Sequence, residues 1–461
     1  MVDHLYFGMG RRSKIDVECL RGDKYKKITR GQLVMKKSNK FWLFGLLTLV
    51  LFLAAACSEE AGDKDDKGKD SDSDTVTLSI GSWRTEDKAG YEKVIEAFNE
   101  KHPDIKVEFK PSKNTEYNTL LNTALQSGEG PDIIHLRPYA PGIALADGGY
   151  IEPLDGIEGL DVFPEASLAA SKGTDGKQYG VPLNMSTTQM FYNKKIFKDL
   201  GLEVPTTWDE FIALNETIKK EGITPIALGS KEGWLLSAVH GIFAPAHYGG
   251  NEFVEKITKG ETDFTSPEFV NTIKAMDELK AYFPDNYEGL GMEDIRTLFF
   301  TEQAAMFPMG SWEIEVVRGM NPDLDFGFFP MPSAVGKDET ITAWVDGSYA
   351  VNANSKHKEE AKKFLEFMTT KEFGELFTKE FKMISAVPDV SSEDELVNGL
   401  SEAVASISTP YMMVVHFAGG NPTSKATLEL ELQGMYLGQQ TPEGVAEKVQ
   451  ENAETWFTPF Q

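Results

Sequence analysis

Cysteine is nearly absent from this sequence of 461 residues. Its two cysteines, Cys19 and Cys57, both precede the part of the chain that has the composition of a folded protein. A disulfide framework and a metal site built from thiolates are therefore excluded from residues 58–461, because both need several cysteines close together. Cys57 then requires a role outside the folded part.

Positive charge and catalytic motifs are also scarce. Lys and Arg number 46 against 72 Asp and Glu, which gives a net charge of −26. Such a chain repels phosphate backbones, so we do not expect nucleic acid as a partner. The sequence has no HExxH, no CxxC, no Ser-centred nucleophile elbow and no phosphate-binding glycine loop, so we expect neither a metal nor another cofactor. Its many carboxylates leave a glycoside hydrolase as an alternative, although no motif marks a pair of them.

Long hydrophobic runs are few, and the most apolar one extends from Phe41 to Leu53. It is shorter than the roughly 20 residues that a membrane-spanning helix needs. Lys36, Lys37 and Lys40 precede it, and the small residues Ala54-Ala-Ala56 follow it. This order of basic, apolar and small residues is typical of an export signal.

The small residues lead directly into Cys57, as in the lipobox of bacterial lipoproteins, which this segment resembles. In lipoproteins the cysteine is acylated and becomes the mature N-terminus. Leu usually stands three residues before it, whereas here that position is Ala54 and Leu53 lies one residue further back. The resemblance implies lipidation at Cys57 and a leader over residues 1–57; an ordinary cleaved signal is the alternative. Because signal peptides begin at an initiator methionine, we expect translation to start at Met35.

Residues 58–74 read SEEAGDKDDKGKDSDSD, without an aromatic or β-branched residue. Such a segment cannot bury enough apolar surface to fold, so we expect a disordered acidic tether. Several of its acidic positions match a calcium-binding loop, but Lys67 occupies a ligand position and no helix brackets the run. Calcium binding is therefore not expected.

The remaining chain, at about 100 to 200 residues per domain, predicts two domains of α/β type. Alternating apolar residues over 75–80 predict a strand, a second strand is expected over 105–109 and a short buried one over 132–136, and the segments between them have helical spacing. This β-α-β-α-β series predicts a mainly parallel sheet, whose ligand lies beyond the carboxyl ends of the strands. The loops there contribute four candidate binding residues: Trp83, Arg84, Arg137 and Tyr139.

Four passages resemble, in the same order, the family 1 extracellular solute-binding proteins, which include maltose- and raffinose-binding proteins. They are SGEGPDIIHLRPYAPGIALADGGYIEPLD from Ser127, YGVPLNMSTTQMFYNKKIFKDLGLEVPTTWDEF from Tyr179, TEQAAMFPMGSW from Thr301 and YAVNANSKHKEEAKKFLEFMTT from Tyr349. The resemblance implies a two-lobed periplasmic-binding-protein-like fold of type II, with an interlobe cleft and a hinge. Lobe 1 would comprise 75–185 plus 331–383, and lobe 2 would comprise 186–330 plus 384–461. The first crossing would be at Asn184 to Thr188 and the second at Phe329 to Ser333.

Carbohydrate sites combine aromatic rings, which stack on sugar C–H faces, with planar polar groups, which bond to hydroxyls. The further candidates for this chemistry are Asn184, Ser186, Thr187, Trp234, Trp312, Trp344 and Asp346. The resemblance implies that Trp312, in its Gly-Ser-Trp motif, stacks on the sugar. For His416 and Phe417 a role in the cleft and a role in the core are equally supported, and Trp42, Trp208 and Trp456 are assigned to the signal or to packing.

The resemblance implies a function in transport. We expect a monomeric, lipid-anchored subunit of an ABC importer on the outer face of the cytoplasmic membrane. It would catalyse nothing and would deliver a carbohydrate to permease subunits. Five candidate aromatics favour an oligosaccharide, because each further sugar ring needs its own stacking surface. A binder of a non-sugar solute, such as a peptide or polyamine, is the other alternative.

Overall fold

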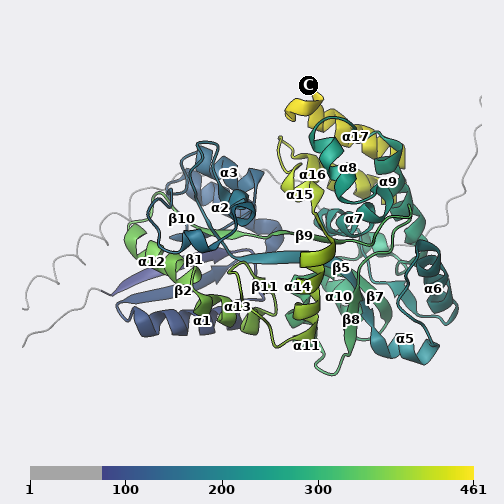
Figure 1. Cartoon of the computed structure of the whole chain (residues 1–461), viewed down its shortest axis with the longest axis horizontal. Helices are drawn as coiled ribbons and strands as arrows, with labels where there is room; N and C mark the ends of the chain where they lie inside the picture. The colour runs from purple at the N-terminus through teal and green to yellow at the C-terminus, as the bar shows by residue number, and fades with distance from the viewer. Residues whose placement is uncertain (1–74) are drawn as a thin grey trace, which may run out of the picture. The chain divides into compact units, whose positions relative to one another are not determined.

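The computed structural model describes residues 75–461. The expected leader, Met35, Trp42, the lipidation site Cys57 and the tether at 58–74 lie outside the described residues. From Thr75 onward the chain alternates between helices and strands and builds two β-sheets (Figure 1). No helix in this part of the chain combines the length and apolar character needed to cross a membrane.

The first sheet has five strands in the order β2-β1-β3-β10-β4. These are β1 (Val76–Ser82), β2 (Ile105–Pro111), β3 (Ile133–Leu136), β4 (Val181–Pro182) and β10 (Ser348–Val351). β1 runs parallel to β2 and to β3, as the alternation of the sequence predicts. β10 is antiparallel to both of its neighbours, β3 and β4.

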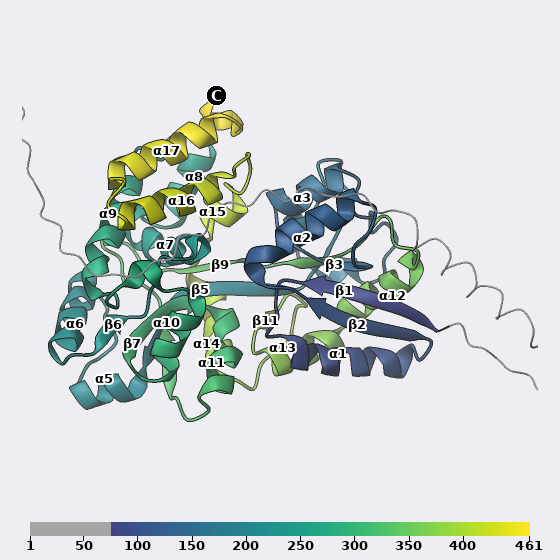
Figure 2. The same cartoon turned by 180° about the vertical axis from the view of Figure 1, so that it is seen from behind.

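Helices from two separate stretches of sequence surround this sheet. They are α1 (Lys88–Lys101), α2 (Asn114–Gln126), α3 (Ala140–Asp147), α4 (Glu165–Leu168), α12 (Lys358–Met368) and α13 (Lys371–Phe381). α1 and α13 lie side by side (Figure 1 and Figure 2). Tyr91, Val94 and Phe98 recur at helical spacing on α1 and are buried against the sheet. We call this sheet and its helices lobe 1.

The second sheet has seven strands, with β5 (Asn184–Asn193) at its centre. Its other strands are β6 (Thr224–Ile226), β7 (Ala304–Gly310), β8 (Phe326–Phe329), β9 (Ile341–Val345), β11 (Ile384–Ser385) and β12 (Ser408–Pro410). β5 is antiparallel to β7, β8, β9 and β11: β11 and β9 pair with its first half, and β7 and β8 both pair with its second half.

The helices around the second sheet complete what we call lobe 2. They are α5 (Lys194–Leu200), α6 (Trp208–Lys220), α7 (Gly233–Tyr248), α8 (Asn251–Thr258), α9 (Pro267–Leu279), α10 (Met292–Phe300), α11 (Ile314–Met320), α14 (Glu395–Ile407), α15 (Met412–Val415), α16 (Ser424–Tyr436) and α17 (Pro442–Glu454). α7 is buried along almost its whole length. It packs against α9 and α16, so it forms the centre of the largest apolar core.

The chain crosses between the lobes at places that differ in part from the expected division. It enters lobe 2 along β5, but it does not return at Phe329–Ser333. The prolines there end β8, yet the chain remains in lobe 2, because β9 fills the position beside residues 185–188 of β5. The return lies at Asp346–Gly347, between β9 and β10. Gly347 has a φ of +84° there, which favours glycine.

The last crossing also lies later than expected. β11 pairs with the start of β5, but Ala386 and Val387 still pack in the core of lobe 1. The chain joins lobe 2 only at α14, whose Val397 and Leu400 are buried in that lobe. Residues 331–345 therefore lie in lobe 2 and residues 384–387 contact both lobes.

Candidate ligand-binding site

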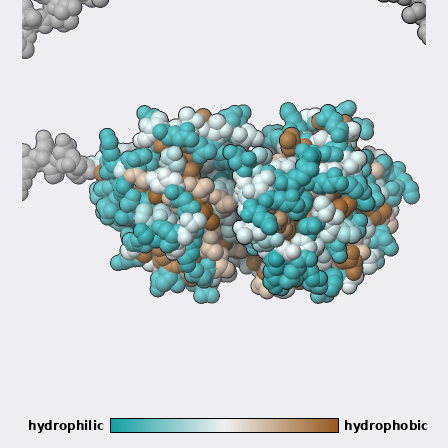
Figure 3. Space-filling view, turned by 90° about the horizontal axis from the view of Figure 1, so that it is seen from above, coloured by the Kyte–Doolittle hydropathy of each residue, from teal (hydrophilic) through white to brown (hydrophobic). Residues whose placement is uncertain are grey.

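A cleft of about 920 Å³ is lined by residues of both lobes. Lobe 1 contributes the loops after β1 and β3, which are the carboxyl ends of parallel strands, together with the start of α2. Lobe 2 contributes the starts of α7, α10 and α16 and the turn after β7. The surface around it is mainly hydrophilic, with scattered apolar patches (Figure 3).

Most of the predicted binding residues line this cleft. They are Trp83, Arg84, Arg137, Asn184, Trp234, Trp312, Trp344 and Asp346. Tyr139, Ser186 and Thr187 do not. Tyr139 packs instead against the core of lobe 2, where burial raises its pKa to about 12, and its backbone has a φ of +59°. Thr187 is fully buried in β5, and its N–H donates to the Ser311 hydroxyl at 3.2 Å.

Ser186 acts on the cleft through another residue. Its hydroxyl donates to Oδ2 of Asp346 at 2.9 Å and accepts from the side-chain amide of Asn184 at 3.0 Å. The backbone N–H of Asp346 also donates to the carbonyl of Asn184, at 2.9 Å. The start of β5 thus fixes the orientation of the Asp346 carboxylate, which lies at the return crossing.

Trp83 is held between two other side chains. The ring of His135 stacks on one face, with centroids 3.5 Å apart and planes inclined by 14°. The guanidinium carbon of Arg137 lies 3.9 Å from the centre of the Trp83 ring. Trp83 is only 7% exposed, because His135 and Arg137 cover its ring. Of these three side chains, Arg137 is therefore the one that can bond to a ligand in the cleft.

The Arg137 guanidinium is fixed in place without an ion pair among residues 75–461. Its Nε donates to Oδ1 of Asn118 at 3.2 Å, and Nη2 donates to Oδ1 of Asn114. Burial lowers the pKa of Arg137 to about 10, and the Asp346 carboxylate opposes this shift. At neutral pH Arg137 is therefore an oriented cation that still has N–H groups for a ligand.

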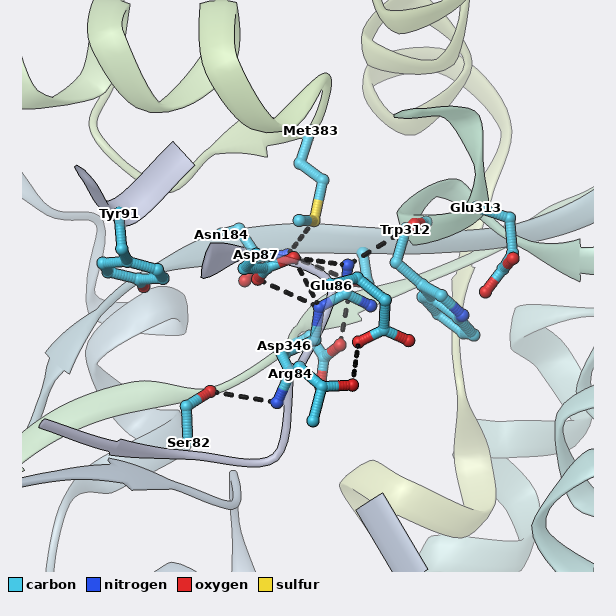
Figure 4. A network of polar contacts seen from close by, with 12 residues as sticks. Ser82, Arg84, Glu86, Asp87, Tyr91, Asn184, Trp312, Glu313, Asp346 and Met383 are labelled. Atoms are coloured by element: carbon cyan, nitrogen blue, oxygen red, sulfur yellow. Dashed lines mark hydrogen bonds and ion pairs between the residues drawn. The ribbon is translucent and has the colours of Figure 1, made fainter. Parts of the chain in front are cut away.

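Arg84 is committed to contacts within the protein (Figure 4). Its guanidinium binds Asp87 with two bonds, Nε to Oδ2 at 3.0 Å and Nη2 to Oδ1 at 2.8 Å. Nη2 also reaches the carbonyl oxygen of Trp312 in lobe 2, at 3.5 Å. Burial lowers the pKa of Arg84, but Asp87 outweighs it and the net shift is upward. Arg84 therefore contacts both lobes and holds the loop after β1.

The opposite wall contains a buried ion pair that the sequence analysis missed. Nε and Nη2 of Arg296 donate to the two carboxylate oxygens of Glu313 at 2.8 and 3.0 Å. Arg296 also lies 3.6 Å from Glu86 of lobe 1, and this second ion pair joins the two lobes. Burial raises the pKa of Glu313, although Arg296 works against this. Neither residue stands in a motif, so only the folded chain reveals the pair.

Trp312 lies directly after β7, in the 3₁₀ turn Ser311–Glu313. Its indole folds back over Gly310, where a Cβ atom would overlap the six-membered ring. The Trp312 ring meets Trp344 edge to face at 5.8 Å, and Trp344 meets Tyr411 in the same way at 5.0 Å. The three rings form an aromatic row along the cleft. The close approach of the Trp312 indole explains why the Gly-Ser-Trp motif has a glycine at position 310.

Trp234 faces the cleft from the first turn of α7. Its indole N–H donates to Oε2 of Glu232 at 2.9 Å, and Oε1 of the same carboxylate accepts from the N–H of Met292 at 3.0 Å. This pair of bonds joins the starts of α7 and α10. Trp234 remains partly exposed, so a face of the ring can contact a ligand.

The remaining aromatic candidates are packed in lobe 2. Phe417 is fully buried and therefore belongs to the core and not to the cleft. His416 does not line the cleft either. Trp208 packs on Phe211, and Trp456 packs on Phe417, as predicted. Tyr411, Lys425 and Glu429 line the cleft but were missed, because they lie in helices and loops without a recognisable pattern.

Two α/β lobes with a cleft between them define a two-lobed solute-binding protein of type II. The family model for the bacterial extracellular solute-binding protein matches residues 81–375. The chain belongs to this family, as its four ordered passages predict. The family consists of binding proteins and not of enzymes.

Individual relatives agree with this assignment. The chain is 31% identical over 351 residues to the multiple sugar-binding protein of Streptococcus mutans, covering 73% of this chain and 80% of the relative. It is 25% identical over 387 residues to the galactooligosaccharide-binding protein of Bacillus subtilis, covering 81% and 86%.

Two solved structures are similar over nearly the whole described part. A chitin oligosaccharide binding protein has a TM-score of 0.72 and 27% identity, covering 84% of this chain and 100% of that chain. RafE in complex with raffinose has a TM-score of 0.70 with the same coverage. At 24% identity, the likeness to RafE concerns the fold alone.

Proposed function

We propose that this chain binds a carbohydrate in the cleft and delivers it to an ABC permease. The observation that carries the proposal is the partly exposed indole of Trp312, which packs on the buried Trp344 and Tyr411 and has polar groups beside it. Aromatic rings stack on the C–H faces of sugars, while oriented groups such as Arg137 and Asp346 bond to hydroxyls. The names of the relatives support sugar as the solute.

The size of the cleft favours an oligosaccharide. Ligand pockets typically measure about 300 to 1,000 Å³, and this cleft lies near the upper end. Trp234 lies at the start of α7 and Trp312 in the turn after β7, so two different elements present aromatic rings to the cleft. A ligand of several sugar rings would use both.

The proposal includes the expected location and partners. Acylated Cys57 would hold the protein, as a monomer, at the outer face of the cytoplasmic membrane, and residues 58–74 would separate the body from the lipid. The lobes would close around the sugar by bending where β5 begins, at Asp346–Gly347 and after β11. The permease would recognise the closed form.

A cationic solute is the second candidate, because the cleft contains more carboxylates than the sequence analysis expected. Most of them are neutralised within the protein. Asp87 binds Arg84, Glu313 binds Arg296, and Glu429 binds Lys425. This pairing favours a neutral polyhydroxyl ligand over a polyamine. Membership of a family of binding proteins weighs against a glycoside hydrolase.

A thermal-shift screen tests the proposal. A ligand that binds only the folded form raises Tm, by an amount that grows with its concentration relative to Kd. We expect at least one of melibiose, raffinose, stachyose, maltotriose and chitobiose to raise Tm, and spermidine and dipeptides to leave it unchanged. A rise with spermidine alone would replace the sugar by a cation, and cleavage of a bound sugar on long incubation would identify an enzyme.

A further inference from the structure

The three segments that cross between the lobes lie side by side. Residues 183–186 are in the middle, with residues 344–347 on one side and residues 384–386 on the other. In the first of these pairings, the N–H of Asp346 donates to the carbonyl of Asn184 at 2.9 Å. The crossings therefore form one narrow strip of sheet beside the cleft.

Hydrogen-bonded side chains run across this strip. Ser186 is fully buried, and its hydroxyl donates to Oδ2 of Asp346 at 2.9 Å and accepts from the amide of Asn184 at 3.0 Å. The same amide also donates to the sulfur of Met383, just before the third crossing, at 3.7 Å (Figure 4). Ser186 therefore links Asp346 to all three crossing segments.

The Asp346 carboxylate keeps one oxygen for a ligand. Its Oδ1 accepts no hydrogen bond from residues 75–461, yet this oxygen is not enclosed by the protein. Asp346 lines the cleft, so Oδ1 is open to it. Because Ser186 holds the other oxygen, the free oxygen has a fixed direction. A side chain that is ordered before binding loses less conformational entropy when the ligand arrives.

We infer that Ser186 is a positioning residue for the sugar: it holds Oδ2 of Asp346 so that Oδ1 accepts a hydroxyl proton of the ligand. Burying a hydroxyl is unfavourable unless it is bonded, and the bond that Ser186 donates goes to a carboxylate that is open to the cleft. Asp346 lies at a crossing, where closure displaces the chain least, so its bond to the sugar can form before and after closure. The inference rests on the proposed function and adds the residue that orients one of its acceptors.

A double-mutant cycle between Ser186 and Asp346 tests the inference, by calorimetry with the sugar that gives the largest thermal shift in the wild type. Asp346→Ala should weaken binding about 10- to 150-fold, the loss of a hydrogen bond to a charged group. Ser186→Ala should weaken it about 2- to 10-fold, the cost of ordering a carboxylate that is no longer held. In the Asp346→Ala background, Ser186→Ala should change the affinity by less than about 2-fold, because its effect passes through Asp346.

Thr188→Val is the matched control. Thr188 lies on the same face of β5, two residues further along, and its buried hydroxyl makes no hydrogen bond with residues 75–461. This substitution should leave the sugar affinity unchanged. If Ser186→Ala fails to fold, Ser186→Cys takes its place in the cycle, because a thiol is a much weaker donor than a hydroxyl. At saturating sugar the folded Ser186 variant should still contract in small-angle scattering, since the crossings keep their backbone pairing.

Three results would overturn the inference alone. They are unchanged affinity in either single variant, an equal loss from the Ser186 substitution with and without Asp346, and an equal loss in Thr188→Val, which would indicate a general disturbance of β5. Absence of contraction in the Ser186 variant at saturating sugar would also overturn it, because Ser186 would then act in the hinge. No thermal shift with any sugar in the wild type would overturn the proposed function and this inference together.

Discussion

Replacing Gly310 by alanine should displace Trp312 from the cleft. The backbone at Gly310 has a φ of −89°, which alanine adopts freely, so any effect is due to the added methyl group. That methyl would overlap three atoms of the six-membered ring of the Trp312 indole. A shift of a few tenths of an ångström does not relieve such an overlap, so the indole must rotate out of its position.

Two consequences follow, with different magnitudes. Forcing an extra methyl into a packed site costs about 1 to 3 kcal/mol of folding free energy. Loss of the edge-to-face contact with Trp344, at 5.8 Å, contributes about 0.5 to 1.5 kcal/mol of that range. If Trp312 stacks on the sugar, its rotation should also weaken binding by about 1 to 3 kcal/mol, which is about 5- to 150-fold in Kd.

Urea denaturation and calorimetry with the best sugar from the screen measure the two effects. Trp312→Ala gives the reference value for complete loss of the indole. Gly319→Ala is the matched control, because a Cβ atom there meets nothing within 4 Å and the residue lies in α11. It should increase stability by about 0.5 to 1 kcal/mol and leave affinity unchanged. Wild-type affinity in folded Gly310→Ala and Trp312→Ala variants would refute a stacking role for Trp312.

Three further predictions concern motion, anchoring and pH. Small-angle scattering should show a smaller radius of gyration with bound sugar, because closure brings the lobes together; no contraction with a tight ligand would contradict the hinge. Cys57→Ser should release the protein from the membrane fraction of cells, and unchanged retention would exclude the lipid anchor. Burial opposes the charged form of Asp132, but hydrogen bonds from Ser355 and Ser79 outweigh this effect and lower the pKa of the carboxyl. The stability that this carboxylate contributes is therefore present above its unfolded-state pKa of about 4, and it is lost as pH falls through its folded-state pKa. Asp132→Asn should therefore cost about 1 to 3 kcal/mol at pH 7 and much less at pH 3, measured by urea denaturation, and an equal loss at both pH values would contradict this account.

Local sequence patterns predicted the strand order and the cleft residues at the start of lobe 1. The alternation of strands and helices from Thr75 to Leu136 predicted the parallel pairing of β1 with β2 and β3. The position of Trp83, Arg84 and Arg137 after those strands placed them at the cleft. These inferences succeed because a parallel sheet brings the carboxyl ends of its strands to one edge, whatever the details of packing.

The role of each of these side chains in the cleft depends on neighbours that are distant in the sequence. Trp83 was a candidate for stacking on a sugar, but His135 and Arg137 cover it. Ser186 was a candidate ligand contact, but it orients Asp346, which is 160 residues away in the sequence. No local pattern specifies such pairs, because they depend on which segments lie beside each other in the folded chain.

The sequence by itself determined that this is an α/β protein of two lobes, that its described part lacks the cysteines for disulfides, and that an aromatic follows Gly310 at a strand end. Each of these depends on residue type and on spacing along the chain. Only the tertiary structure decided that the return crossing lies at Asp346–Gly347, that Arg296 and Glu313 form a buried pair, and that Trp344 and Tyr411 join Trp312 in one aromatic row. These features arise where segments far apart in the sequence pack together, and burial there fixes which polar groups are bonded within the protein and which remain for a ligand.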